Sequence, residues 1–180
     1  MFIYLIIIGL WGGGLSSSET TYQSTAGSVV FTSNAPLEII RAESDQLRGI
    51  LVPEEKRFAF TVAMRSFAGF NSPLQREHFR ENYLETDRFP SATFSGKIID
   101  AVDFSTPGTY TVRTKGILEI HGVPRERIIR GKLTVEKDYL RITADFTVPL
   151  EAHNIRIPRL VRQKIAETIA VSITTEMRSE

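Results

Sequence analysis

The sequence predicts an all-β protein, a single antiparallel barrel of eight strands with one short helix beside its opening. From Tyr22 onward, runs of alternating apolar and polar residues are separated by turn residues, as in antiparallel strands that bury one face. The later runs extend over about 10–14 residues, which suits a barrel better than a sandwich of short strands. Gly96, Gly116 and Gly131 lie inside such runs, where glycine often marks the bends that barrel closure requires.

The composition is that of one folded domain with little net charge. The chain has 180 residues, of which 42% are hydrophobic, enough for a sizeable core and too many for a disordered chain. Its formal net charge of +1 gives no reason to expect nucleic acid as a partner. The chain has no cysteine, which excludes disulfides, thiolate catalysis and cysteine-rich zinc sites.

The N-terminal segment resembles a secretory signal. Residues 2–11 form an apolar run that is too short to span a membrane, which needs about 20 residues. Small residues follow at 12–18, as in a cleavage zone, although no Lys or Arg precedes the run. We therefore expect residues 1–19 to be a signal peptide and residues 20–180 to form the barrel domain of a periplasmic or secreted protein. The alternative is an uncleaved buried strand or a membrane-tethering tail.

The first half of the barrel domain contains three short strand candidates and one strand of regular alternation. Residues 27–33 predict a first strand, and residues 47–52 predict another that ends before Pro53. Residues 37–42 fit either a strand or one to two turns of helix. In residues 58–64, Phe58, Phe60 and Val62 share one face of a strand.

One helix is predicted, over residues 73–84. Ser72 is a suitable N-cap, and Pro73 fits the first helical position because it lacks a donor that would remain unpaired there. A helix of this length is marginal by itself, so tertiary contacts must hold it against the barrel, beside the opening.

The second half alternates with few interruptions. Strands are predicted over residues 92–98, 110–120, 129–135 and 140–150, joined by turns that contain Pro or Lys-Asp. The last strand carries Ile165, Ile169, Val171 and Ile173 on its apolar face.

The inward-facing residues of these strands are the candidate ligand-binding residues. An eight-stranded barrel is just wide enough to be filled by side chains or to hold one small or elongated ligand, and composition does not decide between these alternatives. The residues predicted to line the interior are Phe58, Phe60, Val62, Phe94, Ile98, Val112, Gly116, Leu118, Leu133, Ala144, Phe146, Ile169 and Val171.

The motifs of the common enzyme classes are missing from the sequence. There is no Gly-x-Ser-x-Gly nucleophile elbow, and neither type of glycine-rich phosphate loop is present. His78, His121 and His153 are far apart without metal-ligand spacing, although residues on separate elements could still converge at a barrel mouth. The basic clusters at 125–132 and 156–164 lack interleaved aromatic residues, so we expect no nucleic-acid binding.

Several motifs in order resemble the YceI-like proteins. The first two are Gln75-Arg76-Glu77-His78-Phe79 and Arg88-Phe89-Pro90-Ser91-Ala92-Thr93-Phe94. The third is Gly116-Ile117-Leu118-Glu119-Ile120-His121-Gly122-Val123, and the likeness extends from about Gly27 to Met177.

The resemblance implies a lipocalin-like barrel that is usually exported to the periplasm. Its elongated apolar cavity would hold a polyisoprenoid or an isoprenoid quinone, with no cofactor, metal or catalytic residue. Arg76 or His78 could bind the polar head of the lipid, or could instead form a salt bridge or cap between helix and barrel. Once processed, such a protein would not be integral to the membrane, and a dimer is an open alternative.

Two other functions remain as alternatives at this point. A barrel with a filled core would act through its surface, as an interaction protein or a stress-associated structural protein. A hydrolase or metal-dependent enzyme would use the histidines.

Overall fold

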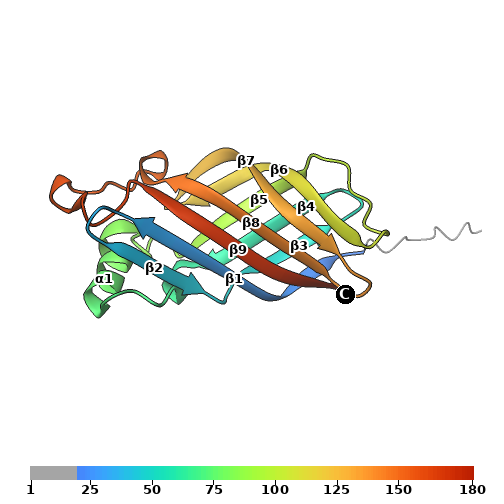
Figure 1. Cartoon of the computed structure of the whole chain (residues 1–180), viewed down its shortest axis with the longest axis horizontal. Helices are drawn as coiled ribbons and strands as arrows, with labels where there is room; N and C mark the ends of the chain where they lie inside the picture. The colour runs from blue at the N-terminus through green and yellow to red at the C-terminus, as the bar shows by residue number, and fades with distance from the viewer. Residues whose placement is uncertain (1–19) are drawn as a thin grey trace, which may run out of the picture.

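The computed structural model describes residues 20–180, which form a closed antiparallel β-barrel (Figure 1). Nine strands form one sheet, and β9 pairs with β1 to close it. β2 and β3 follow each other along the same edge of β1, so the nine strands fill eight positions around the wall. The prediction of an eight-stranded barrel with one short helix is confirmed.

The strands of the second half are long, as their alternation predicted, and each pairs with its neighbour in the chain. The strands are β1 (Tyr22–Asn34), β2 (Ile39–Ser44), β3 (Arg48–Val52), β4 (Arg57–Ala63), β5 (Ser91–Ile98), β6 (Gly108–Ile120), β7 (Val123–Val135), β8 (Leu140–Pro149) and β9 (Thr168–Ser179).

Two segments that were ambiguous in the sequence are resolved by pairing. The segment predicted as either a strand or a helix is β2, because it pairs along residues 29–34 of β1 and thereby satisfies its backbone groups. The prediction that Ile165 belongs to the last strand is wrong. Its N–H donates to the carbonyl of Val161 at 2.9 Å, so the chain is still in a tight turn there, and β9 begins at Thr168.

A short helical segment covers one end of the barrel. α1 (Pro73–His78) begins as predicted, with the hydroxyl of Ser72 accepting the N–H of Gln75 at 3.2 Å. The chain then widens into the π-helix η2 (Phe79–Tyr83), where the N–H of Leu84 donates to the carbonyl of Phe79 at 2.9 Å. The helix predicted over residues 73–84 is therefore present, with a change of helix type after His78.

The two ends of the barrel differ in how they are built. The turns after β3, β5 and β7 lie at the end where the chain terminates (Figure 1). At that end Leu140 and Met177 are completely buried and pack with Val135. The other end carries α1, η2 and the loop between β8 and β9, which contains the short helices η3 (Leu150–His153) and η4 (Arg159–Val161).

The predicted signal peptide, residues 1–19, lies outside the described residues. Between residues 20 and 180, no helix has both the length and the apolar character needed to cross a membrane.

Candidate ligand-binding cavity

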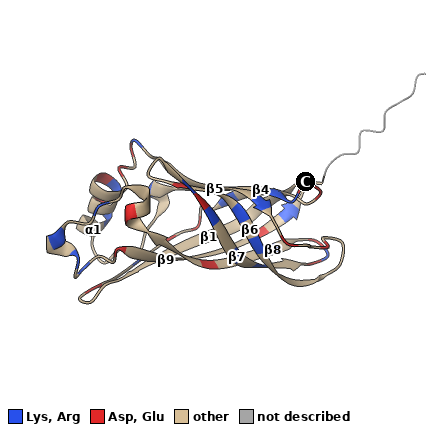
Figure 2. Cartoon of the chain, turned by 90° about the horizontal axis from the view of Figure 1, so that it is seen from above, with Lys and Arg blue, Asp and Glu red and all other residues tan. Residues whose placement is uncertain are grey.

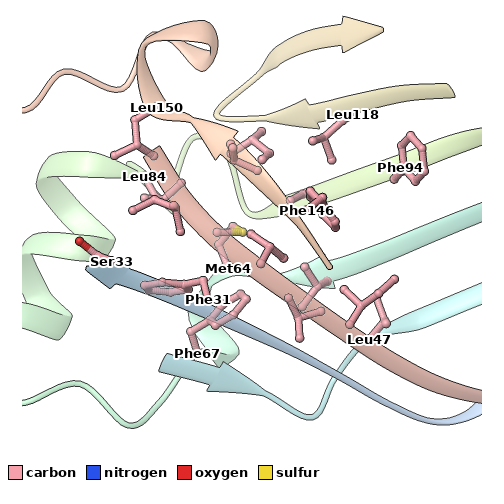
Figure 3. A pocket seen from close by; sticks show the side chains of 18 of the residues that line it. Phe31, Ser33, Leu47, Met64, Phe67, Leu84, Phe94, Leu118, Phe146 and Leu150 are labelled. Atoms are coloured by element: carbon pink, nitrogen blue, oxygen red, sulfur yellow. The ribbon is translucent and has the colours of Figure 1, made fainter. Parts of the chain in front are cut away.

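The barrel contains an apolar cavity of about 520 Å³ (Figure 3). Inward-facing side chains from all nine strands surround it, and residues of α1 and of the β8–β9 loop complete its lining. A volume of this size lies within the range of about 300–1,000 Å³ that is typical of small-molecule sites. The interior is therefore hollow over this volume, and the filled-core alternative does not describe it.

The closed end forms the floor of the cavity. Leu51 and Leu133 line the cavity and are almost completely buried. Leu140 and Met177 pack against the same cluster but do not line the cavity, so they form a plug below it. Close packing of this plug closes the cavity at this end of the barrel.

Aromatic side chains line the deep part of the cavity. The ring of Phe58 lies 5.0 Å from that of Phe94 and 5.8 Å from that of Phe60, measured between centroids. These residues come from the paired strands β4 and β5, and Phe94 and Phe146 point into the cavity in Figure 3. Such rings offer a large apolar surface to an elongated hydrocarbon.

A second aromatic cluster fastens the helical segment to the wall. Phe79 of η2 stacks on Phe31 of β1 with centroids 5.4 Å apart and an interplanar angle of 16°. Phe67 and Phe70, from the connection before α1, lie 5.3 and 5.9 Å from the Phe31 ring. All four rings also line the cavity, so this cluster forms part of its wall near the mouth.

The mouth is polar, in contrast to the depth of the cavity. Glu38 accepts hydrogen bonds at one carboxylate oxygen from the amides of Gln75, at 2.5 Å, and Asn71, at 3.2 Å. The hydroxyl of Ser33 accepts the N–H of Ala166 at 2.9 Å, which ties the β8–β9 loop to β1. Lys164 of that loop also lines the mouth.

Of the residues predicted to line the interior, all but Gly116 line this cavity: Phe58, Phe60, Val62, Phe94, Ile98, Val112, Leu118, Leu133, Ala144, Phe146, Ile169 and Val171.

Gly116 is a correction to the predicted set. It is buried opposite Gly96, and a Cβ atom built on it would lie 2.3 Å from the carbonyl oxygen of Ser95 on β5. This position therefore allows close approach of β5 and β6 and offers no surface to a ligand.

The two predicted head-group residues separate. His78 lines the mouth of the cavity, whereas Arg76 is exposed and outside the lining. The sequence reasoning missed the contribution of the β8–β9 loop, which was seen only as a basic segment. Ile155 and Ile157, which flank Arg156 in that segment, are both buried and line the cavity, so their alternation was the available signal.

The other two histidines connect structural elements at the open end. His121, at a backbone φ of 54°, contacts a carboxylate oxygen of Glu85 at 2.8 Å and the carbonyl oxygen of His153 at 3.2 Å. Hydrogen bonds from His121 and Arg88 lower the pKa of Glu85. His153 is completely buried, which lowers its pKa, and one ring nitrogen contacts the Val123 carbonyl oxygen at 3.0 Å. Within residues 20–180, no three His, Asp or Glu side chains are grouped to hold a metal ion.

Comparisons with known proteins agree with this architecture. Residues 20–177 match the family described as YceI-like domain. No curated protein matches the sequence. Among solved structures, one similar fold is a polyisoprenoid binding domain from Saccharophagus degradans, described as implicated in plant cell wall breakdown. Its TM-score is 0.74 at 15% sequence identity, and the match covers 90% of this chain and 99% of that chain.

Two further structures share the fold. BcnA of Burkholderia cenocepacia has a TM-score of 0.67 at 13% identity over 83% of this chain and 95% of that chain. A mutant YCEI protein with a monobromobimane guest (CJ-N182C) has a TM-score of 0.60 at 13% identity, covering 78% of this chain and 85% of that chain.

Proposed function

The chain belongs to the YceI-like family, and from that premise we propose that it binds one elongated apolar lipid, of the polyisoprenoid or isoprenoid-quinone class, inside the barrel. The observation that carries the proposal is the cavity, which is apolar and aromatic in its depth, plugged at one end and polar at its mouth. The polyisoprenoid-binding description of a protein with the same fold supports the choice of ligand class.

The physical basis of binding is removal of hydrocarbon from water. Each buried CH₂ group contributes roughly 0.8 kcal/mol, so a chain of several isoprene units would bind without specific polar contacts. The wall residues that would contact the lipid chain are Phe58, Phe60, Val62, Phe94, Ile98, Val112, Leu118, Leu133, Phe146, Ile169 and Val171. His78 would lie near the polar head.

We propose a carrier or sequestering role without catalysis, in the periplasm or outside the cell. The absence of a nucleophile motif and the apolar lining support a binding role, and the apolar run at residues 2–11 supports export. An enzyme that uses the histidines receives no support from the site. His121 and His153 serve as contacts between elements, and only His78 lines the cavity.

The test is mass spectrometry of an organic extract of the purified protein, followed by uptake of a long-chain isoprenoid quinone. We expect a lipid at about one molecule per protein. Ala144→Phe should lower uptake at least about tenfold, because Ala144 lines the cavity and the new ring would occupy it. Ala170→Phe is the matched control, since Ala170 is exposed on the neighbouring strand β9. A protein that is empty and takes up no lipid, or equal loss in both variants, would overturn the proposal.

A further inference from the structure

We infer that the open end of the barrel docks on an anionic lipid bilayer, with Leu160 inserted among the lipids and the basic residues of the β8–β9 loop at the headgroups. The inference rests on the proposed function, because an isoprenoid chain has to pass between a membrane and the cavity.

Exposed leucines surround the mouth. Leu160 in η4 is 97% exposed, Leu37 before β2 is 67% exposed, and Leu74 in α1 is 57% exposed. The N–H of Leu37 donates to the carbonyl of Gln163 at 2.8 Å, which places Leu37 against the β8–β9 loop. Leu74 lines the mouth itself. A single exposed leucine is ordinary, but several around one opening indicate an interaction surface.

The middle part of the loop that carries Leu160 is basic. Residues 155–166 contain Arg156, Arg159, Arg162 and Lys164 and no acidic residue, although the whole chain has a net charge of only +1. Within the part of the chain that the structure describes, Arg162 pairs with Glu167 at 3.2 Å, and the other three form no ion pair. Figure 2 shows both basic and acidic residues at the end that carries α1, so the basic character belongs to this loop rather than to the whole end. Unpaired basic residues beside exposed apolar side chains complement anionic headgroups over an acyl layer.

The orientation of the loop gives the docked state a direct route for the ligand. Ile157, Val161 and Ile165 of the loop line the cavity, while Leu160 lies fully exposed between them in sequence. A molecule seated through Leu160 would therefore present its mouth to the bilayer, and an apolar chain could pass without crossing water.

The outer wall of the barrel supplies matched controls. Ile128 on β7 is 60% exposed, and Arg130 lies two residues further along the same strand. Like Leu160 and Arg159, these residues are an exposed aliphatic side chain close to an exposed cation, but they lie on a strand of the barrel wall instead of on the β8–β9 loop.

The experiment measures co-sedimentation of the protein with vesicles. A chain that starts at residue 20 is used, because residues 20–180 contain every strand of the closed barrel and exclude the apolar run at 2–11. We expect binding to vesicles of equal parts phosphatidylglycerol and phosphatidylethanolamine, and much weaker binding to phosphatidylcholine alone or in 1 M salt. Leu160→Ser should lower the partition coefficient about tenfold, and Arg159→Glu at least about fivefold. Ile128→Ser and Arg130→Glu should leave it unchanged.

Three results would overturn the inference. The first is that the parent chain does not bind anionic vesicles. The second is that the loop variants (Leu160→Ser, Arg159→Glu) and the wall variants (Ile128→Ser, Arg130→Glu) lose binding equally. The third is that the protein forms Leu160-dependent dimers in sedimentation, which would assign the surface around Leu160 to a second copy of the chain. Failure of the proposed function is a different result. In that case vesicle binding persists, but no isoprenoid quinone is taken up, either from vesicles or from ethanol solution. If only docking fails, uptake from ethanol solution remains normal.

Discussion

The closed end and the open end of the barrel are built from the same strands but by opposite rules. At the closed end, tight turns bring Val135, Leu140 and Met177 together, and no space remains between them. At the open end β7 and β8 are no longer paired beyond Gly131 and Ala144, and a short helix and a loop with little regular structure surround the mouth. The comparison suggests that the stability of the fold resides mainly in the plug, which leaves the mouth free to serve binding.

Charge separates the two ends as well. The turns after β3, β5 and β7 at the closed end hold six acidic residues and two lysines, whereas residues 155–166 of the open-end loop hold four basic residues and no acidic one. A chain with a net charge of +1 thus has acidic turns at one end and a basic loop at the other. Such a polarity would orient the molecule near an anionic surface with its mouth forward.

The largest expected difference between the ends is in stability. Leu140→Ala removes a completely buried side chain from the plug and should lower the free energy of unfolding by about 2–5 kcal/mol. Leu160→Ala at the open end should change it by less than about 0.5 kcal/mol, because that side chain is already in water. Urea unfolding of the two variants measures both values. Similar losses would mean that the loop contributes to the core.

A smaller effect is expected from the cap of the helical segment. Ser72→Ala removes the hydroxyl that accepts the Gln75 N–H, and should cost about 1 kcal/mol, confined to α1. Hydrogen exchange of the α1 amides should accelerate about fivefold, while amides of β7 and β8 at the closed end keep their rates. Ser91→Ala, at an exposed position at the start of β5, is the control. Equal acceleration at both ends would show that the helix unfolds only together with the barrel.

The smallest expected effect is on the pH dependence of stability. As the pH falls, the first group to lower stability should be His153 at the open end. Burial lowers the pKa of His153, so the unfolded chain binds a proton more tightly than the folded protein does. Its contribution to stability is therefore complete well above pH 6.5 and decreases as the pH falls through that value, by no more than about 0.8 kcal/mol at pH 6 relative to high pH. At the closed end, hydrogen bonds from Ser105 and Thr106 lower the pKa of Asp103 to about 2. That contribution is present above pH 4 and is lost progressively as the pH falls from 4 to 2.

NMR titration of the histidine ring and aspartate carboxyl resonances checks the order in which these two groups titrate. We expect the His153 ring to titrate below pH 6.5 and the Asp103 carboxyl to titrate last. A His153 ring that titrates above pH 6.5 would contradict the prediction and would indicate that water reaches the site.

Much of the wall could be predicted from alternation alone. Phe58, Phe60 and Val62 share a face by the two-residue period of a strand, and that period holds wherever the strand is placed. Gly116 obeyed the same pattern but was assigned wrongly, because the approach of Ser95 depends on how closely β5 and β6 pack. The lining by Ile155 and Ile157 was missed since no regular element carries these residues to the mouth.

The barrel, the inward face of each long strand and the start of the capped helix could be read from the amino-acid sequence alone, because these depend on local periodicity and capping chemistry. Three features came from the folded chain: the interior is hollow, β2 and β3 share one position in the wall, and the basic loop lies beside the mouth. Those outcomes depend on which side chains meet across strands distant in the chain. The plug of Leu140 and Met177 and the open space above it use the same kinds of residue.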